Sequence, residues 1–499
     1  MLRNPCLAIY LCVLLGIVGF VSSQDLIESC SSDNVYQAVD KQLIYNGWHA
    51  PDAVWVSRNP QSIQGSPFDG IAFRMTNADA FLFENRLWTT DDVPLEVLGQ
   101  VPWGDLDENF IKVLAQSPKQ MDWFDEARWE TILTNTGLLS QAISASGARG
   151  IFFDPEFYYS GDGAFSPWVY GIQFYPSHTI TEVEALVRQR GASFMEALQT
   201  HTSDVRVLSY FLGSRTFFEA EGDPAQKDWS NYALIPAFFS GMLSVADAEA
   251  VIIDGNEDSY YIDDTLQFTQ QYQFIREQSV SYYDTDVRTQ YGDEVQVSFA
   301  IYPDYVMELW PEYDRGRSEE YSLRWLEHNL YHALLVSDQY VWWYDEIYNW
   351  FGYINEGLIG LYEPSGGVMQ SPSDAVRALV PAVRERLISE QGLGYEMSKP
   401  YDYRDNPDID AEWLPLPAIL KVSAQTVQLG EPVTVTLDAP QFNDYQFDLY
   451  INSRYYQDFR TEIMLSDLPL GVNTLFVRGT RWSDLQHFTS PPTTVRVGC

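Results

Sequence analysis

Residues 150–156 read Gly-Ile-Phe-Phe-Asp-Pro-Glu, a short apolar run that ends in two carboxylates. An apolar run of this length after a glycine is typical of a buried strand, and residues 123–146 before it carry apolar side chains at helical spacing. A helix followed by a buried strand is the repeating unit of a parallel α/β sheet. This stretch therefore predicts the fold class, and its carboxylates mark a place where chemistry could occur.

The same alternation of strand and helix extends from about residue 40 to residue 390. Eight strands are predicted, at residues 43–45, 71–73, 108–113, 150–153, 205–210, 250–253, 295–301 and 340–343. Eight strand–helix units predict a (β/α)₈ TIM barrel, for which about 350 residues is a usual length. A doubly wound open sheet is the alternative, and it is weakened because no glycine-rich dinucleotide loop follows the first strand.

The composition changes after residue 400, where a polar stretch leads into a proline-rich segment. Residues 401–416 are therefore expected to form a linker after a barrel domain over residues 24–400. Short segments of strict apolar alternation follow, as in Val433-Thr-Val-Thr-Leu437. Such strands at regular spacing predict a small all-β immunoglobulin-like sandwich over residues 417–499.

The chain is strongly acidic, with 70 Asp and Glu residues against 30 Lys and Arg residues and a formal net charge of −40. A field of that sign repels phosphate backbones, so nucleic acid is excluded as an expected partner. It also disfavours anionic membrane surfaces. An acidic surface with few lysines suits a protein that stays soluble in salty water, and the oligomeric state stays open.

The first 23 residues have the composition of a secretion signal. Arg3 supplies the charged start, residues 6–20 form an apolar run, and residues 21–23 are small enough for cleavage. The run is too short for a comfortable membrane span, although an uncleaved anchor is the alternative. We therefore expect a secreted protein, extracellular or periplasmic, without membrane insertion.

Two cysteines, Cys30 and Cys499, lie beyond the expected cleavage point. Exported proteins meet oxidising conditions, so a disulfide between them is one expectation and two unpaired thiols are the other. With so few cysteines and six histidines, a Cys/His zinc cluster is not expected. No HExxH pattern, nucleophile elbow or phosphate-binding loop occurs, so neither a metal nor a cofactor is predicted.

Catalytic groups of a (β/α)₈ barrel lie at the carboxyl ends of its strands, so the residues that follow each predicted strand are the candidates. The candidates for catalysis are Asp154, Glu156, Asp254, Glu257 and Glu346. The candidates for substrate binding are Trp48, His49, Arg74, Tyr158, Tyr302, Asp304, Trp343 and Tyr344. Each acidic residue also has a plain structural interpretation, such as a turn, a helix cap or a solvated loop charge.

Paired carboxylates among aromatic residues, which make up 15% of the chain, are typical of glycoside hydrolysis. One carboxyl protonates the leaving oxygen, and the other attacks carbon or activates water. Asp154 and Glu156 are two residues apart, so on a strand they share a face, and their repulsion would raise the pKa of one of them. This favours Glu156 as the proton donor.

Two stretches, residues 150–156 and the sequence Tyr-Val-Trp-Trp-Tyr-Asp-Glu at 340–346, resemble strand ends of the (β/α)₈-barrel glycoside hydrolase superfamily. With Gly47-Trp48 and the turn Pro67-Phe-Asp-Gly70, the layout also resembles uncharacterised secreted bacterial glycosidase-like proteins. The resemblance covers about residues 40–390 and implies a glycosidase-like barrel.

The resemblance offers two catalytic templates. In chitinase-like enzymes a D-x-E ends the fourth strand, which would make Glu156 the acid, Asp154 the helper of a substrate acetamide and Trp343 a sugar contact. In the two-carboxylate retaining families Glu156 would be the acid, with Glu346, Glu257 or Asp254 as its partner. The second template is preferred, because the acidic run that precedes the chitinase motif is absent here.

The sequence thus predicts a secreted glycoside hydrolase that acts on a polysaccharide or oligosaccharide. Two other functions stay open. One is a glycan-binding barrel without catalysis, in which the rim carboxylates bind sugar hydroxyls. The other is a polysaccharide lyase that recruits Arg74 and Tyr302, which the scarcity of basic residues disfavours.

Overall fold

The computed structural model describes most of the predicted barrel and the strands that follow it. The described residues are 41–117, 121–158, 166–170, 175–220, 224–262, 265–313, 317–355, 368–389, 393, 395, 414–415, 419–428, 430–438, 445–451, 454–459, 461–466, 468, 471–481, 487–490 and 493–498. The predicted signal, most of the predicted linker, Cys30 and Cys499 lie outside them. The chain divides into two units, one of residues 38–263 and 267–387 and the other chiefly of residues 388–499.

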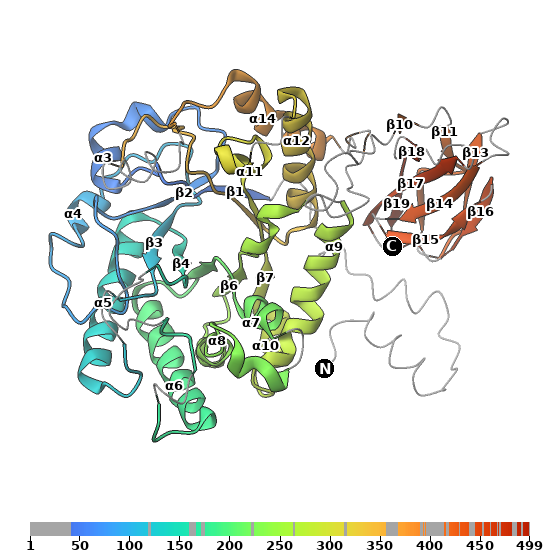
Figure 1. The fold of residues 1–499 in the computed structure, drawn as a ribbon. Coiled ribbons are helices and arrows are strands. Elements are labelled where there is room, and N and C mark those ends of the chain that lie inside the picture. The colour runs from blue at the N-terminus through green and yellow to red at the C-terminus, as the bar shows by residue number, and fades with distance from the viewer. Residues whose placement is uncertain are drawn as a thin grey trace. The chain divides into compact units, whose positions relative to one another are not determined.

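The first unit contains a parallel sheet of nine short strands (Figure 1). They are β1 Gln42–Tyr45, β2 Gly70–Phe73, β3 Phe110–Leu114, β4 Gly150–Asp154, β5 Arg206–Ser209, β6 Val251–Asp254, β7 Val295–Val297, β8 Phe299–Ile301 and β9 Tyr340–Trp343. The hydrogen-bonded order is β7-β6-β5-β4-β3-β2-β1-β9-β8. Because β7 and β8 are halves of one segment, the two ends of this order meet and the sheet closes into a barrel.

The junction at Ser298 explains why one predicted strand is two. Ser298 N donates to Asp254 O on β6 at 2.8 Å, while Asp338 N, just before β9, donates to Val297 O at 3.0 Å. The segment therefore pairs with β6 through its first half and with β9 through its second. The predicted α/β barrel of eight strand units is confirmed, with its seventh unit broken in the middle.

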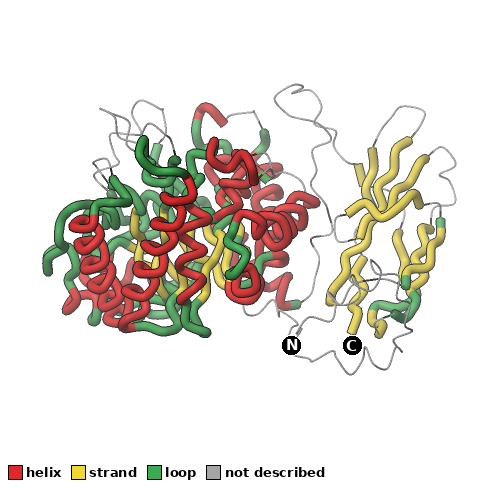
Figure 2. Tube along the Cα trace, turned by 90° about the horizontal axis from the view of Figure 1, so that it is seen from below, coloured by secondary structure: helices red, strands yellow, loops and turns green. Residues whose placement is uncertain are grey.

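Helices surround the strands on the outside, as the red and yellow tubes of Figure 2 show. They are α3 Ala53–Arg58, α4 Leu95–Leu98, α5 Glu126–Ser146, α6 Ile180–Leu198, α7 Gly213–Glu219, α8 Ile235–Val245, α9 Thr265–Gln273, α10 Arg288–Glu294, α11 Pro303–Val306, α12 Glu319–Val336 and α14 Asp374–Ile388. Within the described residues, none of these helices has the length and apolar character needed to cross a membrane.

The helix predicted over residues 264–280 does not run through. α9 gives way to a π-helical turn at Phe274–Gln278 and a 3₁₀ turn at Ser279–Tyr282. The carbonyl of Ile275 accepts from Ser279 Oγ and from Tyr291 Oη, each at 2.8 Å. Side-chain hydroxyls thus compete for an acceptor of the helical ladder, which is a known way to interrupt a helix.

Helices α6 and α8 cross at unusually close range through a pair of glycines. A Cβ on Gly191 would lie 1.9 Å from the carbonyl oxygen of Phe238, and one on Gly241 would lie 1.9 Å from the carbonyl oxygen of Arg188. Each glycine therefore faces the backbone of the other helix, which cannot move aside as a side chain can. Both helices pack on β4, where Phe153 contacts Phe194 of α6 and Phe238 of α8.

The variant Gly191→Ala is expected to destabilise the barrel by about 3 kcal/mol, because overpacking against backbone forces the helices apart. Gly137→Ala on α5 is the matched control, since nothing lies within 4 Å of its Cβ position. That change should stabilise the protein by about 0.5–1 kcal/mol through helix propensity. Urea denaturation measures both, and equal free energies of unfolding for the two variants would contradict the glycine contact.

Two histidines on α12, His328 and His332, are buried one turn apart, with ring centroids separated by 4.6 Å. Burial lowers the pKa of His328 to about 4, and burial with the charge of His328 lowers the pKa of His332. Both rings are therefore neutral in the folded protein at neutral pH, and they pack against Phe268.

This pair predicts a loss of stability in mild acid. The unfolded histidine binds a proton below about pH 6.5 and the folded one does not, so stability present above that pH falls as the pH drops toward 4. For His328 alone the loss reaches about 2 kcal/mol by pH 5. The free energy of unfolding of His328→Gln should therefore fall less between pH 7.5 and pH 5 than that of the exposed control His201→Gln. If the free energy of unfolding falls equally with pH in the two variants, the predicted role of His328 is contradicted.

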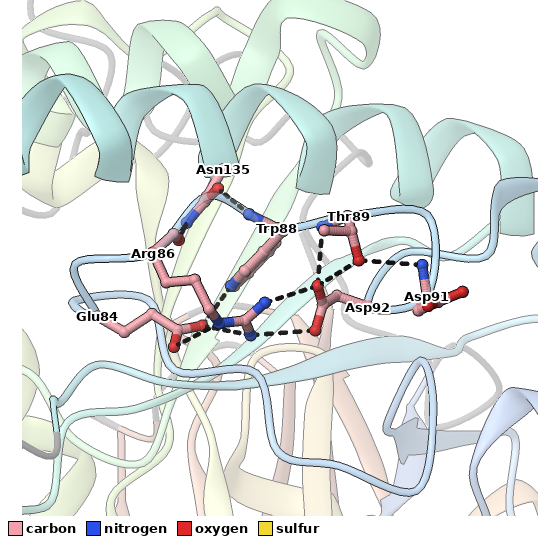
Figure 3. A network of polar contacts seen from close by, with 7 residues as sticks. All are labelled: Glu84, Arg86, Trp88, Thr89, Asp91, Asp92 and Asn135. Atoms are coloured by element: carbon pink, nitrogen blue, oxygen red, sulfur yellow. Dashed lines mark hydrogen bonds and ion pairs between the residues drawn. The ribbon is translucent and has the colours of Figure 1, made fainter.

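The connection between β2 and β3 is held against α5 by the buried side chain of Asn135 (Figure 3). Its Oδ1 accepts from Trp88 N and its Nδ2 donates to Arg86 O, both at 2.9 Å. Arg86 also forms ion pairs with Glu84 and Asp92, and its hydrogen bond lowers the pKa of Asp92 to about 2. Because Arg86 is exposed, the amide of Asn135 fixes this connection more than the ion pairs do.

The second unit is a small β domain with two sheets. Its strands are β10 Leu414–Pro415, β11 Ile419–Val422, β12 Thr426–Gln428, β13 Val433–Asp438, β14 Tyr445–Ile451, β15 Arg454–Phe459, β16 Glu462–Leu465, β17 Gly471–Arg481, β18 His487–Thr489 and β19 Thr493–Gly498. One sheet has seven strands and the other three, β11-β13-β16. Apolar side chains from both sheets, such as Val435 and Leu449, form one core. The all-β prediction is confirmed, while the immunoglobulin-like topology stays a prediction.

Candidate active site

Two carboxylates lie at the carboxyl end of β4. Phe152 faces the barrel interior, where its ring contacts Tyr210 and Trp342, and alternation puts Asp154 on the same face. Asp154 is only 1% exposed, and its Oδ1 accepts from the backbone N–H of Glu156 at 3.0 Å. The Glu156 side chain is partly exposed. Asp154 thus fixes the turn that holds Glu156 above it.

Tyr158 joins these two carboxylates. Its hydroxyl lies 3.1 Å from Asp154 Oδ2 and 2.6 Å from Glu156 Oε2. A hydroxyl has one hydrogen, so both contacts are satisfied together only when one carboxyl carries a proton. Burial raises the pKa of Asp154 to about 7, the positive charge of Lys112 opposes that rise and the charge of Glu156 adds to it. The pair therefore holds a proton close to neutral pH.

A third carboxylate comes from the loop after β6. Glu257 begins a 3₁₀ turn, and its backbone N–H donates to Tyr210 O at 3.0 Å. Burial raises its pKa well above the usual range, and the charges of Glu156 and Asp154 raise it further. Such mutual repulsion requires that the carboxyls be near one another. The ends of β4 and β6 thus bring Asp154, Glu156 and Glu257 into one group, here called the carboxylate cluster.

Aromatic rings line the barrel interior next to the carboxylate cluster. Tyr210 stacks on Trp342 with 5.0 Å between ring centroids, and Tyr260 stacks on Tyr344 at 5.4 Å. Trp342 and Tyr260 are themselves 5.3 Å apart, so the four rings form one layer. Trp342 Nε1 donates to Gly255 O at 2.7 Å, which fixes the indole. This apolar layer removes water from beside the acids, which explains why burial is the main cause of their raised pKa values.

Glu346 follows β9 and is joined to the aromatic layer through Tyr344. Its Oε1 accepts from Tyr344 Oη at 2.9 Å, and its backbone N–H donates to Asp304 Oδ2 at 2.8 Å. Its charge raises the pKa of Tyr344 and of Tyr302, beyond the rise that burial causes. Glu346 is therefore placed with Tyr302 and Tyr344.

Asp254, a predicted catalytic residue, lies on the outer side of the barrel wall. It is fully buried and accepts hydrogen bonds from the Ser214 side chain and the Leu212 backbone at the start of α7, while burial raises its pKa to about 6. The next residue, Gly255, is the one next to Trp342 inside the barrel. The catalytic assignment of Asp254 is therefore wrong. The position that faces the barrel interior at the end of β6 is Gly255, one residue later, and not Asp254.

Trp343, predicted to contact sugar, is out of phase in the same way. It is fully buried, packs on Phe68 and Trp350, and donates from Nε1 to Asp345 Oδ2 at 2.8 Å. Its neighbour Trp342 lies in the interior layer instead. The correction follows from alternation, since consecutive residues of β9 point to opposite faces.

Two further predicted sugar contacts, Asp304 and His49, are buried. Asp304 Oδ2 accepts from the backbone N–H groups of Glu346 and Ile347, at 2.8 and 3.1 Å, and the residue is 0% exposed. It therefore shapes the loop that carries Glu346. His49 is also 0% exposed, and burial together with the charge of Arg74 lowers its pKa to about 4. The predicted direct contact of these two side chains with substrate is therefore corrected. Both residues support the loops around them instead.

The remaining predicted binding residues lie at the carboxyl ends of the strands. Arg74 follows β2, donates to Tyr353 Oη at 3.2 Å and pairs with Asp79 at 3.6 Å. Trp48 is partly exposed and meets Trp310 edge-on at 6.3 Å. The largest exposed ring of the set belongs to Tyr158, at 56%. Tyr302 and Tyr344 face each other with 5.5 Å between their centroids.

Lys112 was not singled out from the sequence. It lies in the middle of β3, and its Nζ is 5.5 Å from the centre of the Tyr210 ring, so it points into the barrel. Burial lowers its pKa, and the negative charge of Asp154 counteracts this. The available signal was the stretch Phe-Ile-Lys-Val-Leu, where one lysine interrupts an apolar strand.

Two further observations bear on where chemistry can occur. Across the described ranges, no group of three or more His, Cys, Asp or Glu side chains is arranged to hold a metal ion. A hollow of about 420 Å³ is lined by Pro60 and by residues 63–66 and 102–106. Those loops lead into β2 and β3, so the hollow lies at the amino end of the strands, away from the carboxylate cluster.

No family model matches the chain. No curated protein matches it either. Solved structures similar to it include an endo-beta-1,4-mannanase from Thermotoga petrophila (9% identity, covering 92% of this chain and 98% of that one, TM-score 0.31). A glucosidase from Croceicoccus marinus has 9% identity, coverage of 92% and 97%, and a TM-score of 0.36.

Another similar structure belongs to a differently named protein. A putative sugar phosphate isomerase/epimerase from Anabaena variabilis has 10% identity, coverage of 70% and 100%, and a TM-score of 0.36. Likenesses this weak do not separate one barrel activity from another. The carboxylate cluster is therefore the feature of the molecule that bears on function.

Proposed function

We propose that the protein is a glycoside hydrolase that cleaves a polysaccharide or oligosaccharide, with Glu156 and Glu257 as the acid–base pair. The observation that supports this is the meeting of carboxyls from the ends of β4 and β6 beside an aromatic layer, in surroundings that hold a proton near neutral pH. Glycoside hydrolysis needs one protonated and one ionised carboxyl at the scissile bond. Aromatic faces beside such a pair suit the apolar faces of sugar rings.

The hydrogen bonds favour a particular division of roles. Glu156 Oε2 accepts from Tyr158 at 2.6 Å, and a hydrogen bond to the charged form stabilises a carboxylate. Glu257 is held next to two like charges in surroundings that disfavour its ionised form. We therefore assign Glu257 as the proton donor and Glu156 as the nucleophile or base. This is the reverse of the order expected from sequence, in which Glu156 donates.

Asp154 is assigned as a positioning residue. Its two oxygens are engaged by the backbone N–H of Glu156 and by Tyr158, and it is 1% exposed. An aspartate so enclosed is poorly placed to hold a substrate acetamide. The two-carboxylate template is thus favoured over the chitinase-like one.

The proposal also covers where the protein acts and what its second unit does. The composition of residues 1–23 supports export, so the proposed site of action is extracellular or periplasmic. The small β domain, which we propose is immunoglobulin-like, would space the barrel from a surface or bind glycan.

The test uses the protein from residue 24 to residue 499 on a panel of marine and bacterial polysaccharides, with release of reducing ends as the readout. Wild type should release reducing ends from at least one glycan, and Glu156→Gln should release none above background. Glu130→Gln on the exposed face of α5 is the matched control and should keep wild-type activity. Binding of a glycan without cleavage would contradict the proposal and assign a glycan-binding barrel instead.

A further inference from the structure

Lys112 is an isolated cation inside an acidic protein. It is one of 30 basic residues set against 70 acidic ones, and it is half-buried on the inner face of β3. In the part of the chain that the structure describes, its ammonium has a ring contact with Tyr210 but no hydrogen bond or ion pair. Removing an ammonium from water is costly unless an anion or several acceptors replace the water. Its position therefore needs a counter-charge.

The nearest acid on the sheet, Asp154, supplies only part of that charge. Asp154 lies one strand away, since Lys112 pairs in register with Phe152 and Leu114 with Asp154. The oxygens of Asp154 are already engaged by Glu156 N and Tyr158 Oη. A carboxyl that shares a proton within that group carries less than a full charge. Lys112 therefore has room for an anionic partner of its own, since its amine is in contact with the Tyr210 ring and, among the described residues, not with a carboxylate.

A second cation lies next to Lys112. Phe73 of β2 pairs with Ile111 of β3, so Arg74 occupies the register position beside Lys112. Arg74 is held by Tyr353 and by the more exposed Asp79. The ends of β2 and β3 are thus basic, whereas the ends of β4 and β6 carry the carboxylate cluster. A ligand that spans the ends of β2 and β3 and the ends of β4 and β6 therefore meets positive charge on one side and negative charge on the other.

We propose that the sugar bound beside the carboxylate cluster carries an anionic substituent, a carboxylate or a sulfate ester, which Lys112 binds. The inference rests on the proposed function and names the class of its substrate. The bond to be cleaved lies at Glu156 and Glu257, and the anionic group points toward β2 and β3. Arg74 adds long-range attraction there, while Tyr353 and Asp79 hold it in place.

The test is calorimetric binding in the background of Glu156→Gln, so that no substrate is consumed. The probes are tetrasaccharides of glucuronic, galacturonic and mannuronic acid with their carboxyl-reduced counterparts, and a sulfated fucan tetrasaccharide with its desulfated counterpart. At least one anionic probe should bind about 10- to 100-fold more tightly than its neutral counterpart, as expected for a hydrogen bond to a charged group. The pair that shows this preference identifies the anionic group.

Adding Lys112→Met should reduce that ratio to about one, and Lys112→Arg should preserve most of it. Lys227→Met, which removes a lysine whose ammonium is paired with Glu184, is the matched control and should leave the ratio unchanged. An unchanged ratio in Lys112→Met, equal weakening of both members of the pair, or no preference in the parent protein would overturn the inference. Preference without any cleavage by the wild type would instead overturn the proposed function.

Discussion

Replacing Glu156 with glutamine is expected to lower kcat on the glycan by about 10³- to 10⁴-fold, the range for removing an acid–base or nucleophilic group. The amide keeps the shape of the side chain and can still accept from Tyr158, so the fold should be intact. It cannot become the anion that attacks carbon or activates water. Steady-state kinetics with a circular dichroism melt measures both effects.

Glu346→Gln is the informative comparison for this variant. Glu346 also follows a strand and also accepts from a tyrosine, Tyr344, at 2.9 Å. It lies outside the carboxylate cluster, so its loss in kcat should be smaller than that of Glu156→Gln by at least about 100-fold. A reversed ranking would transfer the partner role to Glu346, which the sequence also allowed.

Replacing Asp345 with alanine is expected to destabilise the barrel by about 4 kcal/mol. Its buried carboxyl accepts from Tyr45 Oη at 2.9 Å, from Trp343 Nε1 at 2.8 Å and from Trp350 Nε1 at 3.0 Å. Alanine would leave two buried indole donors without an acceptor and Tyr45 Oη with only the long contact to Tyr348 O at 3.4 Å, and each unsatisfied donor costs about 1–3 kcal/mol less any relaxation. Urea denaturation gives the free energy of unfolding.

Asp92→Ala provides the contrast, because Asp92 pairs with the exposed guanidinium of Arg86. Removing an exposed partner of this kind should cost about 1 kcal/mol or less. If Asp345→Ala costs no more than Asp92→Ala, the three-donor network does not stabilise the junction of β1 and β9.

The barrel could be predicted from sequence because its strands are compact apolar runs between helices. No charged residue interrupts the runs Gly-Ile-Phe-Phe at 150–153 and Tyr-Val-Trp-Trp at 340–343, so both are recognised as buried strands. The break at Ser298 could not be predicted, since Val-Gln-Val-Ser-Phe-Ala-Ile reads as one strand. Only the closing hydrogen bonds to β6 and to Asp338 divide it.

The candidate site was predicted in part for the same reason. Strand ends of a barrel meet at one rim, so Asp154, Glu156 and Glu257 could be grouped before their positions were known. Asp254 and Trp343 could not be placed, because strands that are buried on both faces show no alternation between apolar and polar residues. The phase of such a strand is set by packing, which here favours Trp342 over Trp343 in the interior.

The most direct test of the central claim is how Glu257→Gln responds to the leaving group. Aryl glycosides of the sugar identified in the polysaccharide screen would be compared with the glycan itself. A dinitrophenolate departs without a proton, so kcat/KM of the variant on the dinitrophenyl glycoside, which reports departure of the leaving group, should stay within about 10-fold of wild type while kcat/KM on the glycan falls about 10³-fold. Equal losses on both substrates, or no loss on the glycan, would contradict the assignment of Glu257 as the proton donor.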